Sequence, residues 1–330
     1  MFQLCCKITI GELVFKMVNE VEINTSFKNF TDTCIIKLPR KVYMPGEKYN
    51  TSRLDTQIKR GQAVKVELGY NDKLQVEFAG YVASVKPTVP VEVHCEDDMF
   101  LLKQVPVKPK NFQKAALKDV LDYIGVKKVK ASNGQMLDYK LMGDVKLDGA
   151  FHITNETDTA AKVLKKLKDE CPILFSFMRN GKLCIGDAYE VNAPKVKFAF
   201  GSNIISHSLA YRRKEEVKFS VTVTSKNDNG KDKSIKVGDS DGDQRTFTVS
   251  NKSESDMKKL GQQYLEQLQF DGYRGSFTAF GEPAVQHGNI AELADSEEKE
   301  KDGNYYIDGV KKTFGQSGYR QEIELGKKAS

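Results

Sequence analysis

The sequence of 330 residues contains no tryptophan, and no apolar run approaches the ~18 residues that a membrane-spanning helix requires. Its first residues alternate apolar and polar side chains, with Glu12 and Lys16 placed early. A signal peptide would instead show a basic segment, an apolar block and small residues, in that order. These absences argue against a membrane protein, and we expect the chain to be made and assembled in the host cytoplasm.

Clustered metal ligands are also lacking. No two of the six cysteines form a C-x-x-C pair, and the four histidines are equally scattered along the chain. A zinc site needs ligands at close, regular spacings. We therefore expect buried, reduced thiols, and we expect no metal and no cofactor. The cysteines are Cys5, Cys6, Cys34, Cys95, Cys171 and Cys184.

Known catalytic motifs are absent. The sequence has no G-x-S-x-G, H-E-x-x-H or P-loop pattern. The acidic run Glu96-Asp97-Asp98 follows an expected strand. Glycoside hydrolysis, however, needs two carboxylates on opposite sides of a cleft, ~5–9.5 Å apart, and adjacent residues seldom provide that geometry. Because tryptophan is missing too, no aromatic platform for a sugar is evident, and the sequence predicts that the chain is not an enzyme.

One segment has the alternating carboxylates of a calcium loop. Asp239, Asp241 and Asp243 stand where positions 1, 3 and 5 of such a loop would be. An EF-hand would then have glycine at position 6 and a carboxylate at position 12, but this sequence has Gln244 and Ser250 there. A solvated turn is therefore the favoured interpretation.

The net charge of +6 is distributed unevenly. Residues 1–105 carry 14 basic and 13 acidic groups, residues 106–195 carry 16 and 11, and residues 196–330 carry 21 of each. The excess thus lies in the middle of the chain, mostly as lysines on expected helices. A run of this kind is more often a solvated helix face than a DNA contact, and we expect no specific nucleic-acid partner. The run consists of Lys162, Lys165, Lys166 and Lys168.

Short strands separated by turn signals fill both ends of the chain. Residues 1–105 alternate apolar and polar side chains in several short segments, and residues 196–330 return to this pattern with one helix among the strands. Between them, residues 106–195 mix helical and strand spacing. The sequence therefore predicts an α+β, mainly β fold, with two β-barrel-like tube domains and a small inserted α+β domain at these boundaries.

Three segments have helical spacing. Apolar residues share one face over residues 112–124, over 157–170 and over 255–270. We expect Thr157 to cap the second helix and Pro172 to end it, and Ser253 or Ser255 to cap the third.

Two further pairs of strands are expected, each joined by a connecting segment. Asn180-Gly181 is expected to form a two-residue hairpin turn. The strand at 217–225 needs a partner, for which 245–250 is the natural choice. The polar, glycine-rich residues 227–244 between them are expected to form an exposed hairpin extension or a loose loop.

Four motifs in the first β domain resemble the first tube domain of phage late-control protein D. They lie at residues 58–62, 66–70, 78–82 and 95–97. The segments that look like the closing part of the same family lie at residues 264–281, 285–288, 303–307 and 318–325. Each motif alone is moderately specific, but together they cover most of the chain in the right order, with the insertion where the family has it.

The resemblance implies a structural baseplate hub, since this fold forms the hub of contractile-phage baseplates and the N-terminal part of type VI secretion spike proteins. A hub of this kind is a homotrimer whose subunits each contribute two similar β domains, joining a six-fold tail tube to a three-fold spike in the virion tail baseplate. DNA would pass through its lumen. No sequence identity between the two β domains is evident. The chain stops soon after residue 326 without another barrel, so the spike is expected to be a separate chain.

The useful sites of such a hub would be interfaces. Tyrosine and arginine tend to carry interface energy, so we expect these residues at the edges of the two β domains to make the subunit contacts. Each of them could equally well be buried inside its own subunit. The candidates are Arg60, Tyr70, Tyr81, Tyr305, Tyr319 and Arg320.

Two other classes of function stay open. A tail-associated cell-wall hydrolase would need a separable catalytic domain, and no segment is left over to hold one. A nucleic-acid-binding barrel of the OB type would interleave aromatic and basic residues on one sheet face, but Phe78 and Tyr81 have no basic stripe around them. Salt-independent self-association would favour the hub, and salt-sensitive binding to single strands would favour the OB barrel.

Overall fold

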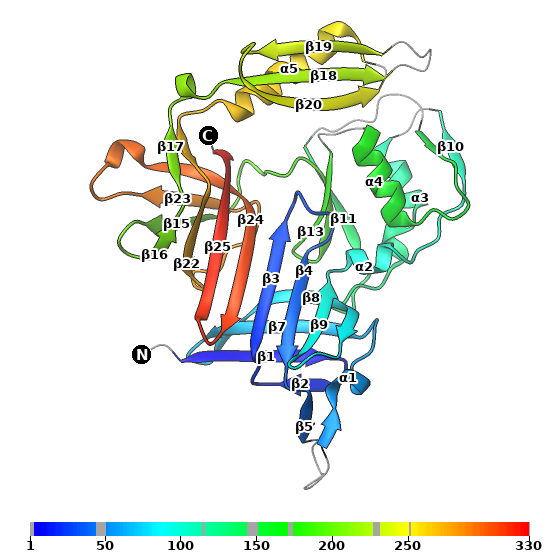
Figure 1. Cartoon of the computed structure of the whole chain (residues 1–330). Helices are drawn as coiled ribbons and strands as arrows, with labels where there is room; N and C mark the ends of the chain where they lie inside the picture. Colours follow the sequence, from blue (N-terminus) through cyan, green and yellow to red (C-terminus); the bar gives the residue numbers. More distant parts are fainter. Residues whose placement is uncertain are drawn as a thin grey trace.

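The computed structural model describes residues 3–43, 51–113, 116–143, 151–170, 174–226, 232–250 and 252–329. The fold is α+β and mainly β, as the sequence predicts. Figure 1 shows one long sheet in the body of the molecule, an inserted unit against one side of it, and a small unit at the far end. None of the described helices combines the length and apolar character needed to span a membrane.

The central sheet has 13 strands and runs through both ends of the chain. Its first half contains β1 (Leu4–Ile10), β2 (Leu13–Phe15), β3 (Glu20–Ser26), β4 (Thr33–Leu38), β7 (Ala63–Tyr70), β8 (Lys73–Lys86) and β9 (Val91–Glu96). Its second half contains β15 (Lys195–Ala199), β16 (Ile204–His207), β22 (Ser276–Phe280), β23 (Ile290–Ala294), β24 (Gly303–Gly315) and β25 (Gly318–Lys328).

The strands of each half surround a core of their own. Alternating residues of β1, β3, β4, β7, β8 and β9, such as Ile8, Ile23 and Val66, are fully buried in the first core. A second core gathers Phe198, Phe277 and their neighbours from β15, β22, β23, β24 and β25. Period-two alternation places every second side chain of a strand on the same face, so one face of each curled half is apolar.

The two halves have the same strand order. The first reads β3-β4-β9-β8-β7-β1, and the second reads β16-β22-β25-β24 with β23 and then β15 beyond β24. The outermost pair differs in direction, because β1 is antiparallel to β7 and β15 is parallel to β23. The structure therefore contains an internal repeat that the sequence does not reveal.

The repeat extends to single residues. Pairing of β8 with β9 slips at a bulge between Val82 and Ser84, which lie opposite Cys95 and His94. Pairing of β24 with β25 slips in the same way between Ile307 and Gly309, which lie opposite Leu325 and Glu324. Because bulges are specific local features, this agreement places Val82 at the position of Ile307 and Ser84 at that of Gly309.

The inserted unit follows the first half and has a separate core. A short strand pairing at 110–112 occupies the start of the first expected helix, which begins only at Leu117. Thr159, and not Thr157, accepts a hydrogen bond from the first turn of the second helix, and Pro172 lies outside the described residues. The elements are α2 (Met99–Leu102), β10 (Lys110–Phe112), α3 (Leu117–Tyr123), η1 (Val126–Lys128), β11 (Asp138–Met142), β12 (Phe151–Ile153), α4 (Ala160–Glu170), β13 (Phe175–Arg179) and β14 (Lys182–Gly186).

The predicted turn in this unit is confirmed. Asn180 and Gly181 join β13 to β14 with φ angles of 52° and 69°, the left-handed conformation that a two-residue hairpin turn requires. Gly181 adopts it without a steric penalty, and asparagine is among the residues that tolerate it best.

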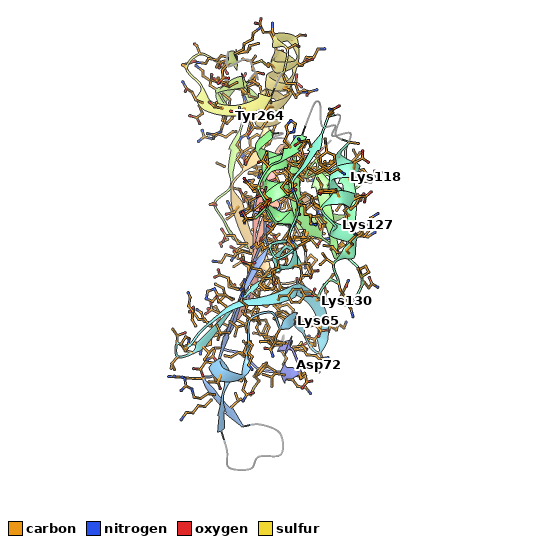
Figure 2. The ribbon with its side chains drawn as sticks, turned by 90° about the vertical axis from the view of Figure 1, so that its right-hand side faces the viewer. Lys65, Asp72, Lys118, Lys127, Lys130 and Tyr264 are labelled. Atoms are coloured by element: carbon orange, nitrogen blue, oxygen red, sulfur yellow. The ribbon has the colours of Figure 1, made fainter. Side chains whose placement is uncertain are left out.

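A small unit of residues 218–268, here called the pendant unit, stands apart from both halves (Figure 1). Figure 2 shows it from the side, with Tyr264 at one end of the molecule and Asp72 toward the other. It consists of β18 (Phe219–Lys226), β19 (Lys233–Gly238), β20 (Asp243–Ser250) and α5 (Glu254–Leu268). Ser253 caps α5, accepting a hydrogen bond from the backbone N–H of Asp256.

The expected pairing of β18 with β20 is present but parallel. Residues 233–238 of the segment between them form β19, which pairs antiparallel with the other edge of β18, so a hairpin is present here. The expectation of a loose loop is wrong for these residues. Residues 227–231 lie outside the described part of the chain.

The remaining elements connect these units. They are β5 (Lys41–Tyr43), β6 (Thr51–Arg53), α1 (Leu54–Gln57), β17 (Ala210–Arg212), η2 (Lys214–Glu216), β21 (Gly272–Arg274) and η3 (Lys299–Lys301). The core of the inserted unit includes Met99 and Leu102, the core of the first half includes Phe314 and Tyr319, and the pendant unit has an additional core. The boundaries themselves stay a prediction, because one sheet crosses from the first range to the last.

Two glycines of β7 and β8 allow neighbouring backbones to approach closely. A Cβ atom at Gly80 would lie 2.1 Å from the carbonyl oxygen of Glu96, and one at Gly69 would lie 1.8 Å from that of Lys73. We predict that Gly80→Ala lowers the free energy of unfolding by about 1–3 kcal/mol, since the backbone must shift to admit the methyl group. Chemical denaturation would measure this.

The matched control is Gln75→Ala, at an exposed position of the same strand. It should change the free energy of unfolding by less than about 0.5 kcal/mol. Equal stability of the two variants would show that β8 and β9 can separate at no cost.

Candidate assembly surface

The two halves of the sheet are joined by β3 and β24. Their antiparallel pairing extends over seven residue pairs, from Gly309 opposite Ser26 to Gly315 opposite Glu20. The hydroxyl of Ser26 also donates to the carbonyl oxygen of Asp308 at 2.9 Å. This pairing joins the two halves into one continuous sheet (Figure 1).

Ion pairs reinforce this joint. The Lys28 ammonium lies 2.8 Å from a carboxylate oxygen of Asp308 and 2.9 Å from one of Glu324, and Lys311 lies 3.0 Å from Glu22. Burial opposes the charge of Lys28, but the two carboxylates outweigh it and raise the pKa of Lys28. The cation therefore stays charged and holds the first half to the second.

A buried polar cluster lies beneath the joint. Glu77 of β8 forms an ion pair with Lys312 of β24, and both side chains are about 95% buried. The Tyr319 hydroxyl donates to the other Glu77 oxygen at 2.7 Å, and the Tyr70 hydroxyl donates to the Tyr319 carbonyl oxygen at 2.8 Å. Burial, together with the adjacent Glu77 carboxylate, raises the pKa of Tyr319. These contacts connect β7 and β8 to β24 and β25.

A cavity of about 540 Å³ lies where the first half, the inserted unit and residues 284–289 meet. Arg179 of the inserted unit lies 3.1 Å from Nδ1 of His287, whose Nε2 lies 3.8 Å from a carboxylate oxygen of Asp32. Arg179 and His287 are both more than nine-tenths buried. The cluster thus holds the inserted unit against both halves of the sheet.

The acidic run at the edge of this cavity supports the backbone. Asp97 accepts hydrogen bonds from the N–H groups of Asp32 and Met99, each at 3.0 Å, and Asp98 accepts one from Ser132 at 2.8 Å. Glu96 forms an ion pair with Lys103 at 2.7 Å. Burial and the nearby Asp32 raise the pKa of Asp97. Each of the three carboxylates thus has partners of its own, and none of these contacts joins two of the three.

The calcium-like segment makes ordinary turn contacts. Asp239 accepts a hydrogen bond from the Gln269 amide at 3.0 Å, and Asp241 forms an ion pair with Lys218 at 2.8 Å that lowers the pKa of Asp241. Within the described ranges, no three His, Cys, Asp or Glu side chains gather in a way that could hold a metal.

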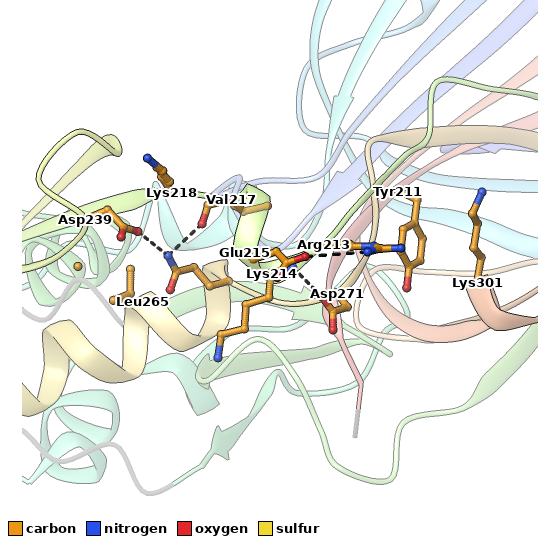
Figure 3. A pocket seen from close by; sticks show the side chains of 12 residues that line it. Tyr211, Arg213, Lys214, Glu215, Val217, Lys218, Asp239, Leu265, Asp271 and Lys301 are labelled. Atoms are coloured by element: carbon orange, nitrogen blue, oxygen red, sulfur yellow. Dashed lines mark hydrogen bonds and ion pairs between the residues drawn. The ribbon is translucent and has the colours of Figure 1, made fainter.

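An open groove of about 930 Å³ separates the pendant unit from the body (Figure 3). Charges of both signs line it, and Arg213 lies 4.0 Å from Glu215. The Asp271 carboxylate accepts a hydrogen bond from the Lys214 backbone at 2.6 Å, and the Gln269 amide donates to the Val217 carbonyl oxygen at 3.0 Å. These contacts anchor the pendant unit at its base.

Several lysine side chains of the run on α4 contact other residues of the same chain. Lys165 and Lys168 place their ammonium groups 5.3 and 4.9 Å from the ring centres of Phe30 and Phe175, and Lys162 donates to the Thr157 carbonyl oxygen at 3.2 Å. The positive charges of these lysines are thus already in contact with aromatic rings and a carbonyl oxygen of the same chain.

Three of the six expected interface residues are buried inside the single chain. Tyr305 and Tyr319 are at most 1% exposed and Tyr70 is 8% exposed. Tyr305 accepts a hydrogen bond from the backbone of Tyr273 at 3.0 Å. These tyrosines pack inside the single chain, because tyrosine satisfies its hydroxyl equally well in a core, and a role for them in subunit contact stays a prediction.

The other three reach the surface. Tyr81 stacks on Phe100 with ring centres 5.6 Å apart, and Arg60 lies 5.4 Å from the same ring. Arg320 lies 4.9 Å from the centre of the Phe280 ring. The six are therefore in three places: Arg60 with Tyr81, Tyr70 with Tyr319 and Arg320, and Tyr305 alone. Subunit contact through Arg60, Tyr81 and Arg320 stays a prediction.

With its 13-stranded sheet and inserted unit, the chain has the fold of solved phage tail proteins. The tail protein of Neisseria meningitidis MC58 is similar with a TM-score of 0.68 at 14% identity, over 98% of this chain and 97% of that one. The 43 kDa tail protein of prophage MuSo2 from Shewanella oneidensis has a TM-score of 0.67 at 17% identity, over 98% of each chain.

A third similar structure comes from a secretion system. The E. coli c3393 protein, described as a component of the type VI secretion system with structural similarity to the T4 tail proteins gp27 and gp5, has a TM-score of 0.59 at 11% identity. The match covers 97% of this chain and 76% of that one. No family model matches the sequence, and no curated protein is similar to it at the level of sequence.

The buried pair beneath the joint generates a prediction. Lys312→Met leaves the Glu77 carboxylate buried without its cation, and we expect the free energy of unfolding to fall by about 3–5 kcal/mol. Lys233→Met is the control, because its ion pair with Glu254 is more than half exposed and should contribute at most about 1 kcal/mol. Urea denaturation of both variants measures the difference.

Replacing both buried partners tests the cause. Glu77→Leu combined with Lys312→Met should recover part of the loss, since no unpaired charge then stays buried. If Lys312→Met costs no more than the control, the pair does not hold the two halves together.

Proposed function

We propose that this chain is a structural hub of a contractile phage tail or a related injection machine, in which three copies form a ring. The ring joins the six-fold tail tube to the three-fold spike in the tail baseplate, and it is assembled in the host cytoplasm. The protein does no chemistry of its own and uses no cofactor.

The observation that carries this proposal is the internal repeat. One chain contributes two units with the same strand order, and β24 and β3 join them edge to edge. Three such chains would present six similar units to a six-fold partner while keeping three-fold symmetry toward another. A single protein can therefore connect rings of different symmetry, which is what a structure between tube and spike must do.

The similar structures support the same proposal. Two are described as tail proteins, and the third is described as a component of the type VI secretion system that is itself structurally similar to tail proteins. The first two match nearly all of both chains. In the proposed hub, residues 1–105 and 196–330 supply the tube domains and residues 106–195 the inserted domain. DNA passes through the lumen without specific contacts, since tight phosphate contacts would slow its passage.

The alternative of a cell-wall hydrolase gains no support from the cavity. Its carboxylates Asp97 and Asp98 accept backbone hydrogen bonds, and its histidine lies between Arg179 and Asp32. A general acid and base must instead be aimed at a shared substrate position. A structural role accounts for each of these contacts.

The proposal predicts a mass near three times 37.1 kDa for the assembled protein. Light scattering at several concentrations, alone and with the spike and tube proteins of the same machine, would measure it. Electron microscopy of the assembled fraction should show a ring of six units. A monomer under all of these conditions, with no binding to spike or tube, would contradict the hub.

A further inference from the structure

The internal repeat specifies more than a shared fold, because one joint between the two units is already present in the chain. That joint uses residues 309–315 of β24 against β3. If the ring repeats the same joint between copies, two strands must pair. One is the strand of the first half that is equivalent to β24, and the other is the strand in the second half of the next copy that is equivalent to β3. The register of the two units identifies both.

The equivalent of β24 is β8. The shared bulge aligns Ser84 with Gly309, so Val85 and Lys86 correspond to Val310 and Lys311. Their partners in the neighbouring strands correspond as well: Val85 lies opposite Val93 of β9, and Val310 lies opposite Ile323 of β25.

The equivalent of β3 is β16 continued into β17. In the first unit, Val93 pairs with Ile36 of β4, which lies opposite Val21 of β3. In the second unit, Ile323 pairs with Phe277 of β22, which lies opposite His207 of β16. Counting three residues on from Val21 and His207 leads to Asn24 and Ala210.

The register confirms this step. Asn24 lies opposite Thr33, and Ala210 lies opposite Arg274, in matching positions of the two units. The residues Thr25 and Ser26 then correspond to Tyr211 and Arg212.

Both segments have a free edge within the described part of the chain. Pairing between β8 and β7 ends at Tyr81, so residues 84–86 pair only with β9. β17 pairs only with β21. Ser84, Lys86 and Arg212 are exposed. Exposed strand edges offer unpaired backbone groups to another strand.

We propose that residues 84–86 of one copy pair antiparallel with β17 of the next copy, Ser84 opposite Arg212 and Lys86 opposite Ala210. The occupant of each edge is thus a second copy of this chain. This inference rests on the proposed ring and specifies the contact that builds it. The ring then alternates two versions of one joint, within a chain and between chains.

The joint between copies is shorter than the joint within the chain. Pro87 follows β8 directly, and Pro90 occupies the position equivalent to Gly315, so neither can donate a backbone hydrogen bond. Three residue pairs therefore replace the seven of β24 and β3. The contact between copies is accordingly weaker, and ring formation depends on concentration or on a bound partner.

Disulfide trapping tests the joint. Directly opposed residues of antiparallel strands have Cα atoms ~4.5–5.5 Å apart, within the range of a disulfide. When full-length Ser84→Cys and Arg212→Cys chains are mixed under mild oxidation, we expect a covalent dimer to form at least ten-fold faster than with the control Lys236→Cys, an exposed position on the pendant unit. Each variant alone gives the background from the native cysteines.

The chain carrying both substitutions should give covalent species that end at three copies, since the ring closes. Equal trapping rates for Arg212→Cys and Lys236→Cys would overturn the proposed joint. If the unsubstituted protein still forms trimers by light scattering, the hub stands and only this contact is wrong. A preferred Ser84–Arg212 disulfide with a ladder that continues past three copies would instead support the joint and overturn the closed ring.

Discussion

The structure depends on the pairing of β24 with β3, which leaves neither of these strands as a free edge at the centre of the molecule. Each half of the sheet alone would end in an open strand, and open edges invite association with any compatible chain. The internal joint satisfies seven residue pairs and adds the Lys28 and Lys311 ion pairs on its surface. Two units that resemble each other thereby form one continuous sheet.

Buried polar groups then fix how the two halves and the inserted unit are oriented relative to one another. Glu77, Lys312 and Tyr319 lie beneath the joint, and Arg179, His287 and Asp32 hold the inserted unit to it. Apolar packing alone would tolerate several docking angles, whereas hydrogen bonds and ion pairs in a desolvated site fix one geometry. A ring must stack accurately on its neighbours, so this specificity is of direct use to a hub.

The sequence predicts the elements whose signals are local. Alternation defines β7 and β8, Asn180-Gly181 defines a turn, and Ser253 defines the start of α5. It does not predict what depends on distant partners: the parallel pairing of β18 with β20, or the burial of Tyr305 and Tyr319, since tyrosine suits both cores and interfaces. The repeat is hard to see in the sequence because equivalent positions such as Cys95 and Leu325 share apolar character without identity, although Val85 and Lys86 match Val310 and Lys311.

The difference between the two joints bears on how such a ring is built. The chain folds by closing the longer joint within itself, where the two edges are covalently tethered and their effective concentration is high. The shorter edges, at residues 84–86 and 210–212, are left for the next copy and are too short to attract strands at random. If the proposed joint is correct, we expect a chain with this asymmetry to fold as a monomer and to polymerise poorly. In the proposed hub, a three-fold partner would bring three such copies together and close the ring, and the proline residues after β8 would then limit assembly without that partner.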